Sequence, residues 1–464
     1  MSSIGRNVQP SSKRRKKPKA TFLDKTVEAE GDSGRAYIVH VEPKGQLSTK
    51  GRTAQDKLEE ALGLAQAIGL LIAGQEIVPL LHPTPATLIG TGKVEEIAGR
   101  IAETEAGIAI VNGQLSPIQQ RNLERAWKAK VLDRTGLILE IFGERASTKE
   151  GILQVELAHL QYQKGRLVRS WTHLERQRGG FGFMGGPGER QIEADRRLIQ
   201  ERITRLQREL DGVVKTRGLH RKGRSRIPFP IVSLVGYTNA GKSTLFNRLT
   251  GAGVLAKDLL FATLDPTIRT IKLPQGRKIA LSDTVGFISD LPTSLIAAFR
   301  ATLEEVVSAD VILHVRDVSH PETEAQADDV LKVLDQLGLT EGKRSHIIEV
   351  WNKADLLEPL EFASRETTAA RRNDCVLISA FNGEGVDRLL QLIEHKLSQG
   401  ETLYSVTLQA ADGEGVAWCH ERAEVIERKI LKDGRVKLKL RMTADRAGQA
   451  ASKFGRSFRK IASA

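Results

Sequence analysis

Apolar residues recur along the chain in short runs that alternate with stretches of helical periodicity. From residue 36, AYIVHVEP and IAIVNG predict strands, whereas AQDKLEEALGLAQAI, GKVEEIAGRIAE and SPIQQRNLERAWKA predict helices. We interpret KVLDRTGLILEIFGERA as one or two further strands. Strands that alternate with helices of about 12 residues indicate a small α/β domain, which we place at residues 31–146.

Residues 147–226 show helical periodicity instead. Ser147 and Glu150 have the spacing of a capping box, which satisfies free backbone N–H groups at the start of a helix. Two apolar series follow on either side of a glycine-rich stretch, the second with the spacing of a coiled-coil seam: Leu153, Leu157, Leu160 and Leu167, then Ile199, Ile203, Leu206, Leu210 and Val213. We therefore predict an antiparallel helical hairpin with basic residues on its outer faces.

Residues 227–398 contain near-continuous apolar runs separated by helical segments: PIVSLVG, RKIALSDTVG, VILHVRDVS, SHIIEVWNKAD and CVLISA. Such runs are typical of strands buried on both faces of a mostly parallel sheet that has helices on both sides. Shorter strand and helix patterns in residues 399–464 predict a small α/β C-terminal module. The fold class predicted for the whole chain is multidomain α/β.

The 464-residue chain has a formal net charge of +13, and its positive charge is concentrated in two segments. Residues 1–19 hold seven Lys/Arg and no acid, and residues 164–228 hold 17 Lys/Arg against seven Asp/Glu. This clustering favours a polyanionic partner, because neutralising phosphates releases counterions. The alternative is a solvated helix face beside a floppy tail. Residues 1–30 are poor in large apolar side chains, and we expect them to form a disordered basic tail.

The cysteine content and the hydropathy of the chain narrow the class of protein further. Cys375 and Cys419 are the only cysteines and lie far apart, so neither a disulfide framework nor a zinc site is indicated. No run of about 18 apolar residues occurs, which argues against a membrane span. We expect a soluble, cytoplasmic protein that acts as a monomer.

One stretch has both the letters and the context of a phosphate-binding loop. IVSLVGYTNAGKST places Gly236-x-x-x-x-Gly241-Lys242-Ser243 directly after a predicted strand and at the start of a helix. The glycines let backbone N–H groups turn towards phosphates, and the helix N-terminus adds positive potential. Lys242 is expected to bridge terminal phosphates, and the Ser243 hydroxyl to bind Mg²⁺.

A second motif, Asp283-Thr284-Val285-Gly286, ends another predicted strand about forty residues later. Asp283 can hold the metal through water, and the Gly286 amide can sense a terminal phosphate. This pattern is common by itself, but it indicates a nucleotide site when it follows a phosphate-binding loop along the chain.

Asn352-Lys353-x-Asp355 discriminates among nucleotides. Guanine offers an N–H and an amino group side by side, so a carboxylate can accept both hydrogens, whereas adenine cannot match that pair. Asp355 therefore favours GTP over ATP. Ser379 and Ala380 close a later strand, where a backbone amide could reach the guanine oxygen.

The segment LLFATLDPTIRT offers Thr263, Thr267 and Thr270 as the switch threonine that ligates Mg²⁺. Together these elements resemble the translation-factor-like class of P-loop GTPases. With FATLDPT, DTVGFI, GPGE, DRTGLILEIF and EGILQVELAHLQY, residues 35–398 are similar to the HflX-type ribosome-associated GTPases. The resemblance assigns the switch threonine to Thr263.

The resemblance implies GTP-dependent binding to the large ribosomal subunit and its rRNA, with splitting or recycling of stalled ribosomes. It also implies Mg²⁺ and GTP or GDP as bound groups, with Ser243 and Thr263 at the metal and Lys242, Thr263 and Gly286 in catalysis. The predicted nucleotide site comprises Gly236, Tyr237, Thr238, Asn239, Ala240, Gly241, Lys242, Ser243, Thr244, Phe261, Ala262, Thr263, Leu264, Asp265, Asp283, Thr284, Val285, Gly286, Asn352, Lys353, Asp355, Ser379 and Ala380.

Phe287 stands where many GTPases have a glutamine that orients the attacking water. A phenyl ring cannot do this, so we expect slow hydrolysis by the isolated chain and stimulation by a partner. Alternatively, Phe287 packs under the switch helix while another residue positions water. Two other functions stay open: a GTP-controlled switch for a protein or membrane partner, and an ATP-driven RNA remodeller, which Asp355 disfavours.

RGGFGFMGGPGE contains Gly180-x-Gly182-x-x-Gly185, the letters of a dinucleotide loop. A polar, basic helix rather than a strand precedes it, so the match is interpreted as accidental. Phe181 and Phe183 between glycines suit stacking on unpaired RNA bases, although they could equally fold back onto the neighbouring domain.

Overall fold

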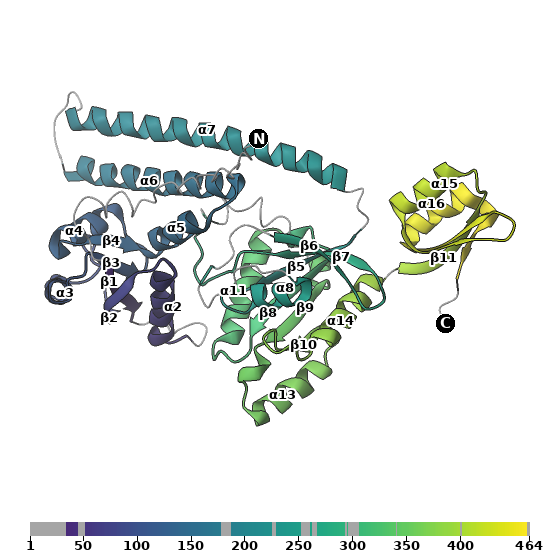
Figure 1. Ribbon diagram of the computed structural model, residues 1–464. Coiled ribbons are helices and arrows are strands. Elements are labelled where there is room, and N and C mark those ends of the chain that lie inside the picture. Colours follow the sequence, from purple (N-terminus) through teal and green to yellow (C-terminus); the bar gives the residue numbers. More distant parts are fainter. Residues whose placement is uncertain are drawn as a thin grey trace, which may run out of the picture.

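The computed structural model describes residues 34–44, 52–177, 187–224, 229–251, 260–261, 267–292, 295, 306–339, 341–399 and 401–461. Figure 1 shows two α/β bodies side by side, a pair of long helices along the first of them, and a smaller body beyond the second. Within the described residues, no helix combines the length and the apolar character needed to cross a membrane. The predicted fold class is confirmed.

The N-terminal domain is built on a four-stranded parallel sheet in the order β2-β1-β3-β4. Its elements are β1 (Arg35–Pro43), α2 (Ala54–Ala67), β2 (Leu71–Leu80), α3 (Thr91–Glu103), β3 (Ile108–Asn112), α4 (Pro117–Trp127), β4 (Lys130–Asp133) and α5 (Arg134–Arg145). The three predicted helices and both predicted strands of this part are present. Thr53 and Ser116 start α2 and α4 with capping boxes, which satisfy backbone N–H groups at each helix start.

The interpretation of residues 130–146 as strands was wrong beyond Asp133. Only β4 is extended, and Asp133 then caps helix α5 by accepting the Gly136 N–H at 2.8 Å. Every residue from Arg134 to Phe142 is buried, so these two and a half turns of the helix have no exposed face. A helix that is buried all round shows the same apolar run as a buried strand, and periodicity cannot separate the two.

Two long helices form the predicted hairpin. They are α6 (Lys149–Gln177) and α7 (Pro187–Arg224), and Figure 1 shows them side by side above the N-terminal domain. The predicted seam is confirmed, because Leu153 and Leu157 of α6 pack in one buried cluster with Ile203 and Leu206 of α7. The helix cap differs from the prediction: α6 starts one residue later, and Thr148 Oγ1 accepts the Gly151 N–H at 3.0 Å.

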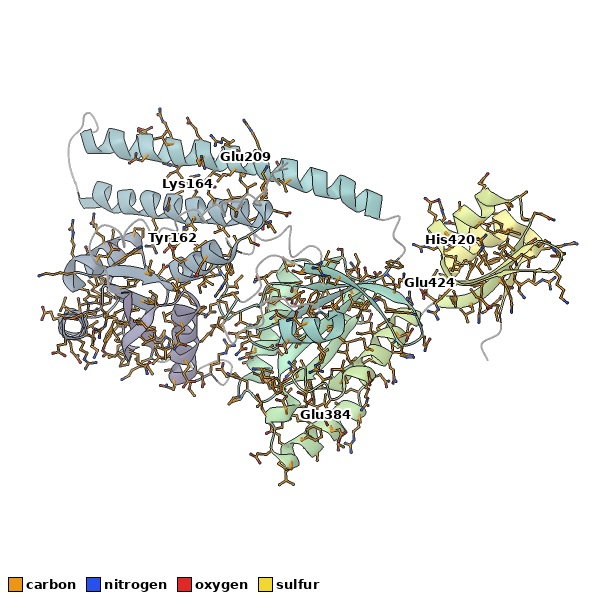
Figure 2. All side chains as sticks on the ribbon, viewed as in Figure 1. Tyr162, Lys164, Glu209, Glu384, His420 and Glu424 are labelled. Carbon is orange, nitrogen blue, oxygen red and sulfur yellow. The ribbon has the colours of Figure 1, made fainter. Side chains whose placement is uncertain are left out.

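The hairpin seam also has a polar contact. Lys164 of α6 faces α7 (Figure 2), where its ammonium group donates to Gln200 Oε1. The glycine-rich stretch 178–186, with Phe181 and Phe183, lies outside the described residues.

Residues 229–399 contain a six-stranded sheet in the order β10-β9-β8-β5-β7-β6, parallel except for β6 against β7. Its elements are β5 (Ile231–Gly236), α8 (Lys242–Thr250), β6 (Thr267–Lys272), β7 (Lys278–Asp283), β8 (Val311–Asp317), α11 (Thr323–Gln336), α12 (Glu341–Arg344), β9 (Ile347–Asn352), η1 (Ala354–Leu356), α13 (Pro359–Ala370), β10 (Cys375–Leu377) and α14 (Val386–Ser398). Apolar clusters lie on both sheet faces, as the continuous apolar runs predicted.

The C-terminal module has a four-stranded antiparallel sheet in the order β12-β13-β11-β14. Its elements are β11 (Glu401–Leu408), α15 (Gly413–Arg422), β12 (Glu424–Ile430), β13 (Val436–Thr443), α16 (Ala444–Phe454), η2 (Gly455–Ser457) and β14 (Phe458–Lys460). The chain order β-α-β-β-α-β is that of a ferredoxin-like unit. Residues from all four strands pack against α15 and α16 in one cluster.

Candidate nucleotide-binding site

The sequence motifs converge at one edge of the six-stranded sheet. Strands β5, β7, β8 and β9 are parallel, so their carboxyl ends meet at the same edge. The loop after β5 is held against the segment after β7 by two backbone hydrogen bonds, Thr238 N–H to Phe287 O at 2.7 Å and Phe287 N–H to Gly236 O at 3.1 Å. Ligands of open α/β sheets bind outside such carboxyl ends. The structure therefore brings the first two motifs together there.

Two glycines of the loop are required by its geometry. Gly236 has φ +153° and Gly241 has φ +88°, which other residues rarely adopt. A Cβ atom on Gly236 would lie 2.1 Å from the Val315 carbonyl oxygen, and one on Gly241 would lie 2.1 Å from Asn352 Nδ2. Asn239 also has a positive φ of 60°, and Ala240 is buried. The result is a tight turn whose backbone leads into the N-terminus of α8.

Lys242 is buried below this loop, where its ammonium donates to the Tyr237 carbonyl oxygen at 2.7 Å. Burial lowers the pKa of Lys242 to about 8, although the Asp283 carboxylate partly opposes the shift. A phosphate group in the loop would stabilise the charged form of Lys242, as the Asp283 carboxylate already does in part. Thr238 Oγ1 is buried and has no hydrogen-bond partner within the described residues, as expected of a loop built around a polar ligand.

Ser243 and Asp283 provide hard oxygen donors beside the loop. Ser243 Oγ donates to Asp283 Oδ2 at 2.9 Å, and Asp283 is completely buried at the end of β7. Oxygen ligands of this kind suit Mg²⁺. Thr244 follows on the first turn of α8. Thr284, next to Asp283, donates to the Leu234 carbonyl oxygen at 2.6 Å and so ties the second motif to β5.

Gly286 approaches the loop closely. A Cβ atom there would lie 2.8 Å from Thr238 Cγ2 and 3.1 Å from Lys242 Nζ, so only glycine lets this backbone reach the phosphate end of the site. Val285 and Phe287 on either side are buried in the core that links the two α/β domains. The Phe287 ring is therefore enclosed in this core and does not line an open site.

The base end of the site is organised by Asn352. Its Nδ2 donates to Ala240 O at 2.8 Å, and its Oδ1 accepts from Ala380 N–H at 2.8 Å. One side chain thus joins the phosphate loop to the segment after β10. The Ala380 amide, predicted as one route to the guanine oxygen, is engaged with Asn352 in this conformation.

Asp355 and Lys353 lie beside Asn352. Ser379 Oγ donates to Asp355 Oδ1 at 2.5 Å, which fixes the orientation of the carboxylate. Lys353 has a left-handed φ of 65°, and its Nζ lies 2.8 Å from Asp317 Oδ2. The predicted base-recognition residues are therefore adjacent and are held by hydrogen bonds and an ion pair.

The predicted switch segment is described only in part. Ala262, Thr263, Leu264 and Asp265 lie outside the described residues. Phe261, predicted as a nucleotide contact, packs its ring edge-on against Phe142 of α5, with centroids 4.8 Å apart. Thr267 and Thr270 are ladder residues of β6, paired with Asp283 and Ala280.

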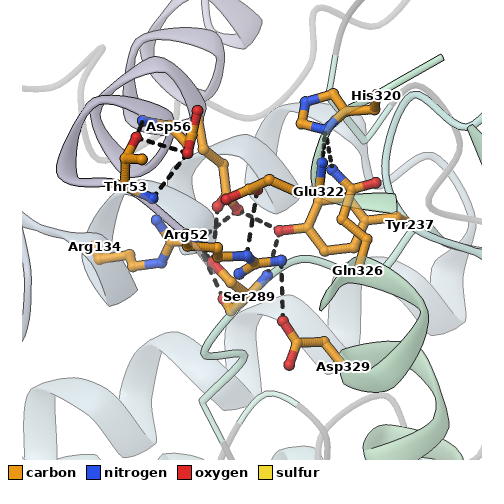
Figure 3. A network of polar contacts seen from close by, with 11 residues as sticks. Arg52, Thr53, Asp56, Arg134, Tyr237, Ser289, His320, Glu322, Gln326 and Asp329 are labelled. Carbon is orange, nitrogen blue, oxygen red and sulfur yellow. Dashed lines mark hydrogen bonds and ion pairs between the residues drawn. The ribbon is translucent and has the colours of Figure 1, made fainter. Parts of the chain in front are cut away.

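A network between the two α/β domains was not predicted from the sequence (Figure 3). Tyr237 of the phosphate loop donates its hydroxyl to Glu60 Oε1 of α2 at 3.0 Å and accepts the Ser289 N–H at 2.8 Å. Arg134 of α5 donates to Glu60 at 2.7 Å and to the Ser289 carbonyl oxygen at 3.0 Å. Tyr237 was predicted as a nucleotide contact, but its side chain serves this domain contact.

Arg52 extends the network towards α11. Its Nε lies 3.3 Å from Glu322, and its Nη2 lies 3.1 Å from Asp329. Burial alone would raise the pKa of Glu60, but Arg134, Ser289 and Arg52 hold it below its usual value. Both motifs at the phosphate end are thus fixed to the N-terminal domain. Nothing in the sequence pattern of α2 or α5 marks Glu60 or Arg134 as a partner in a contact between domains.

Comparison with known proteins matches most of the chain to four family models. Residues 55–143 match "GTP-binding GTPase N-terminal", 145–224 match "GTP-binding GTPase Middle Region", 231–353 match "50S ribosome-binding GTPase", and 365–462 match "HflX C-terminal domain". The first three ranges fall on the α/β domain, the hairpin and the sheet from β5 to β9, and the fourth spans the end of α13, β10, α14 and the C-terminal module.

Curated relatives are similar over most of their length. The GTPase HflX of Magnetococcus marinus is 54% identical over 373 residues, which are 80% of this chain and 85% of that protein. The GTPase HflX of Escherichia coli K12 is 44% identical over 416 residues, or 89% and 94% of the two chains. A solved GTP-binding protein from Sulfolobus solfataricus in complex with GDP is 24% identical, with a TM-score of 0.43, and covers 79% of this chain and 99% of that one.

The site geometry and these similarities agree. The phosphate loop, the buried lysine, the serine–aspartate pair and the ordered base-recognition residues lie together at one sheet edge, in a chain that relatives match over four fifths of its length or more. The chain belongs to the HflX family of GTPases, and it is an enzyme that binds and hydrolyses GTP.

Proposed function

We propose that this GTPase binds the large ribosomal subunit in its GTP state, splits or recycles stalled ribosomes, and hydrolyses GTP rapidly only on the ribosome. The observation that carries the proposal is the burial of Phe287 in the domain core, 1% exposed, at the position where a water-orienting residue is needed. Without such a residue the site lacks a group to align the attacking water, so a partner has to complete it.

Two further observations support a ribosomal partner. Residues 231–353 match a family model described as "50S ribosome-binding GTPase", and the curated relatives are named for the same family. The hairpin helices carry the second of the two basic segments, as suits contact with a polyanion.

Both cysteines are free and buried, which fits the reducing cytoplasm. We propose that the protein acts there as a monomer.

We propose that Ser243 and Thr263 ligate Mg²⁺ and that Asp283 holds it through water. Ser243 and Asp283 already lie within hydrogen-bond distance of each other and supply oxygen donors only, so the residues fit the ion. When bound, Mg²⁺ would neutralise charge on the terminal phosphates.

The protein side chains have separate tasks in this proposal. Lys242 binds the terminal phosphates, and the Gly286 backbone contacts the γ-phosphate. Asp355, oriented by Ser379, accepts the two guanine hydrogens and so selects GTP over ATP. Asn352 keeps the phosphate loop and the base segment at a fixed separation.

Copelleting with purified large subunits tests the partner. The protein is mixed with subunits in a non-hydrolysable GTP analogue, in GDP, and in the matching ATP analogue. We expect strong pelleting only with the GTP analogue. An Asp355→Asn variant serves as the matched control: it should fail with the GTP analogue and recover with the xanthosine analogue. Equal pelleting in all nucleotides would refute a GTP-dependent ribosomal partner.

A further inference from the structure

The C-terminal sheet has one covered face and one open face. Val406, Leu438 and Leu440 point to the covered face, where they pack with Cys419 of α15 and Ala450 of α16. Side chains alternate along a strand, so the residues between them point the other way. Within the described residues, none of the helices packed on this sheet covers the second face.

The strand register defines what the open face presents. Antiparallel partners share a face, so two rows of side chains run across the sheet. The first row is Lys429, Lys437 and Thr407, and the second row is Glu427, Lys439, Ser405 and Arg459. We call these seven residues the basic sheet face. These seven side chains are four cations, one carboxylate and two hydroxyls. The next row of the open face, towards the GTPase domain, is Glu424, Arg441 and Leu403.

The cations of this face are largely unneutralised. Within the described part of the chain, no carboxylate forms an ion pair with Lys437, Lys439 or Arg459, and Lys437 and Arg459 are exposed. Lys429 is 73% exposed and lies 3.9 Å from Glu427, a weak pair. Lys429 and Lys437 stand directly opposite each other, an arrangement that destabilises a sheet. An anion bound across the two strands would relieve this repulsion.

The adjoining end of the sheet is attached to the GTPase domain. Arg277, in the turn between β6 and β7, binds Glu401 through two hydrogen bonds of 2.9 and 3.1 Å. It also lies 3.5 Å from Glu424, which pairs with Arg441 and sits where the module meets the GTPase domain (Figure 2). Arg441 is thereby used internally and only 15% of its side chain is exposed. The contacts with Arg277 involve this end of the sheet and none of the seven residues of the basic sheet face.

We propose that the basic sheet face binds the phosphate backbone of structured RNA in the large ribosomal subunit. Ammonium, guanidinium and hydroxyl groups are the side chains that contact phosphate oxygens. A protein partner would be expected to meet an apolar centre, whereas the seven residues of the basic sheet face are all polar or charged and Leu403 lies at its edge. The β-α-β-β-α-β unit with an uncovered sheet is also the arrangement in which RNA-recognition domains present their binding surface.

The aromatic residues of this module decide how RNA is bound. Tyr404 and Phe458 stack on each other at 4.8 Å and pack with the covered face, not the open one. The basic sheet face therefore has no ring on which an unpaired base could stack. We therefore expect the basic sheet face to recognise the charge and the shape of the RNA but not its base sequence. That the RNA is ribosomal rests on the proposed function, whereas the RNA-binding face itself does not.

The test uses the full-length protein with three charges removed, Lys437→Gln, Lys439→Gln and Arg459→Gln. The matched control removes three charges from elsewhere in the module, Lys432→Gln, Arg446→Gln and Arg456→Gln. Binding to a labelled RNA duplex of about 20 base pairs and to purified large subunits is measured over a range of salt concentrations. Thermal unfolding of both variants checks that the module stays folded.

Each phosphate contact contributes about 0.9 to the slope of log affinity against log salt. The sheet variant should lose about 2 to 3 units of slope on the duplex and bind about tenfold more weakly at low salt, whereas the control should match the wild type. Unchanged binding of the sheet variant to both probes overturns the proposal. So does a loss confined to subunits, which would identify a protein of the subunit as the partner.

GTP hydrolysis with subunits is measured on the same samples. If the sheet variant loses salt slope while the wild type shows no stimulation by subunits, the RNA-binding face stands and the ribosomal function fails. If subunits stimulate the wild type and the sheet variant keeps the salt slope of the wild type, the ribosomal function stands and the RNA-binding face fails.

Discussion

At the scale of single residues, Asp355 decides which base the site accepts. Its carboxylate is fixed by Ser379 and can accept two hydrogens from guanine. We expect Asp355→Asn to weaken GTP binding about 10- to 100-fold, since hydrogen bonds to a charged acceptor contribute about 1.5–3 kcal/mol. Xanthosine triphosphate, which offers a carbonyl at that edge, should bind the variant better than the wild type. Titration with fluorescent analogues of both nucleotides measures this, and unchanged GTP affinity would contradict the assignment.

The buried side chain of His314 leads us to expect that the stability of the protein falls at low pH. Burial in β8, with Arg316 nearby, lowers the pKa of His314 to about 4. The folded protein therefore binds fewer protons than the unfolded chain between pH 4 and 6.5. Its contribution to stability is complete above pH 6.5 and falls by about 3 kcal/mol as the pH drops towards 4. Urea unfolding of wild type and His314→Leu across this range should show a shallower fall in the variant; parallel curves would rule this out.

At the scale of elements, helix α8 has a glycine at each end, and the first of them also closes the phosphate loop. Gly241 and Gly251 flank α8, and both have positive φ, but only Gly241 is crowded. Gly241→Ala should abolish nucleotide binding, because the new methyl displaces Asn352 from Ala240. Gly251→Ala should cost about 1–2 kcal/mol of stability and leave binding intact. Equal nucleotide affinities of the two variants in a fluorescence titration would disprove this role of Gly241.

The motifs of the site could be predicted from the sequence because each is local. A phosphate loop needs only a strand, a glycine turn and a helix in succession, and the structure has all three. Helix α5 could not be predicted, since it is buried on every side and its apolar run mimics a strand. Strand β2 was also missed, because Gly74, Gln75, Glu76 and Pro79 break its apolar residues into short pieces with neither a continuous run nor a strict alternation.

At the scale of the whole molecule, contacts between domains lie beyond sequence patterns. Tyr237 and Phe261 were expected to contact nucleotide, yet their side chains pack against the N-terminal domain. Both residues are separated from their partners by more than 100 positions. Only the docking of two folded domains brings such residues together, and no periodicity within one element encodes it.

The network around Glu60 predicts strong coupling between the domains. Arg134→Ala would leave the Glu60 carboxylate without its closest cation, at a cost of about 3–5 kcal/mol. Adding Glu60→Gln should recover part of the loss, because no uncompensated charge then remains. Equilibrium unfolding in urea compares the two single variants with the double variant. Strict additivity of the two changes would show that the pair is not coupled.

The central claim is that the GTPase site is completed by the large ribosomal subunit. Its most direct test is the rate of GTP hydrolysis at saturating GTP, measured for the same preparation alone and with purified large subunits. With Phe287 buried, the isolated protein should hydrolyse GTP slowly, and subunits should raise the rate by about a hundredfold or more. A rate that is the same with and without subunits would contradict the account.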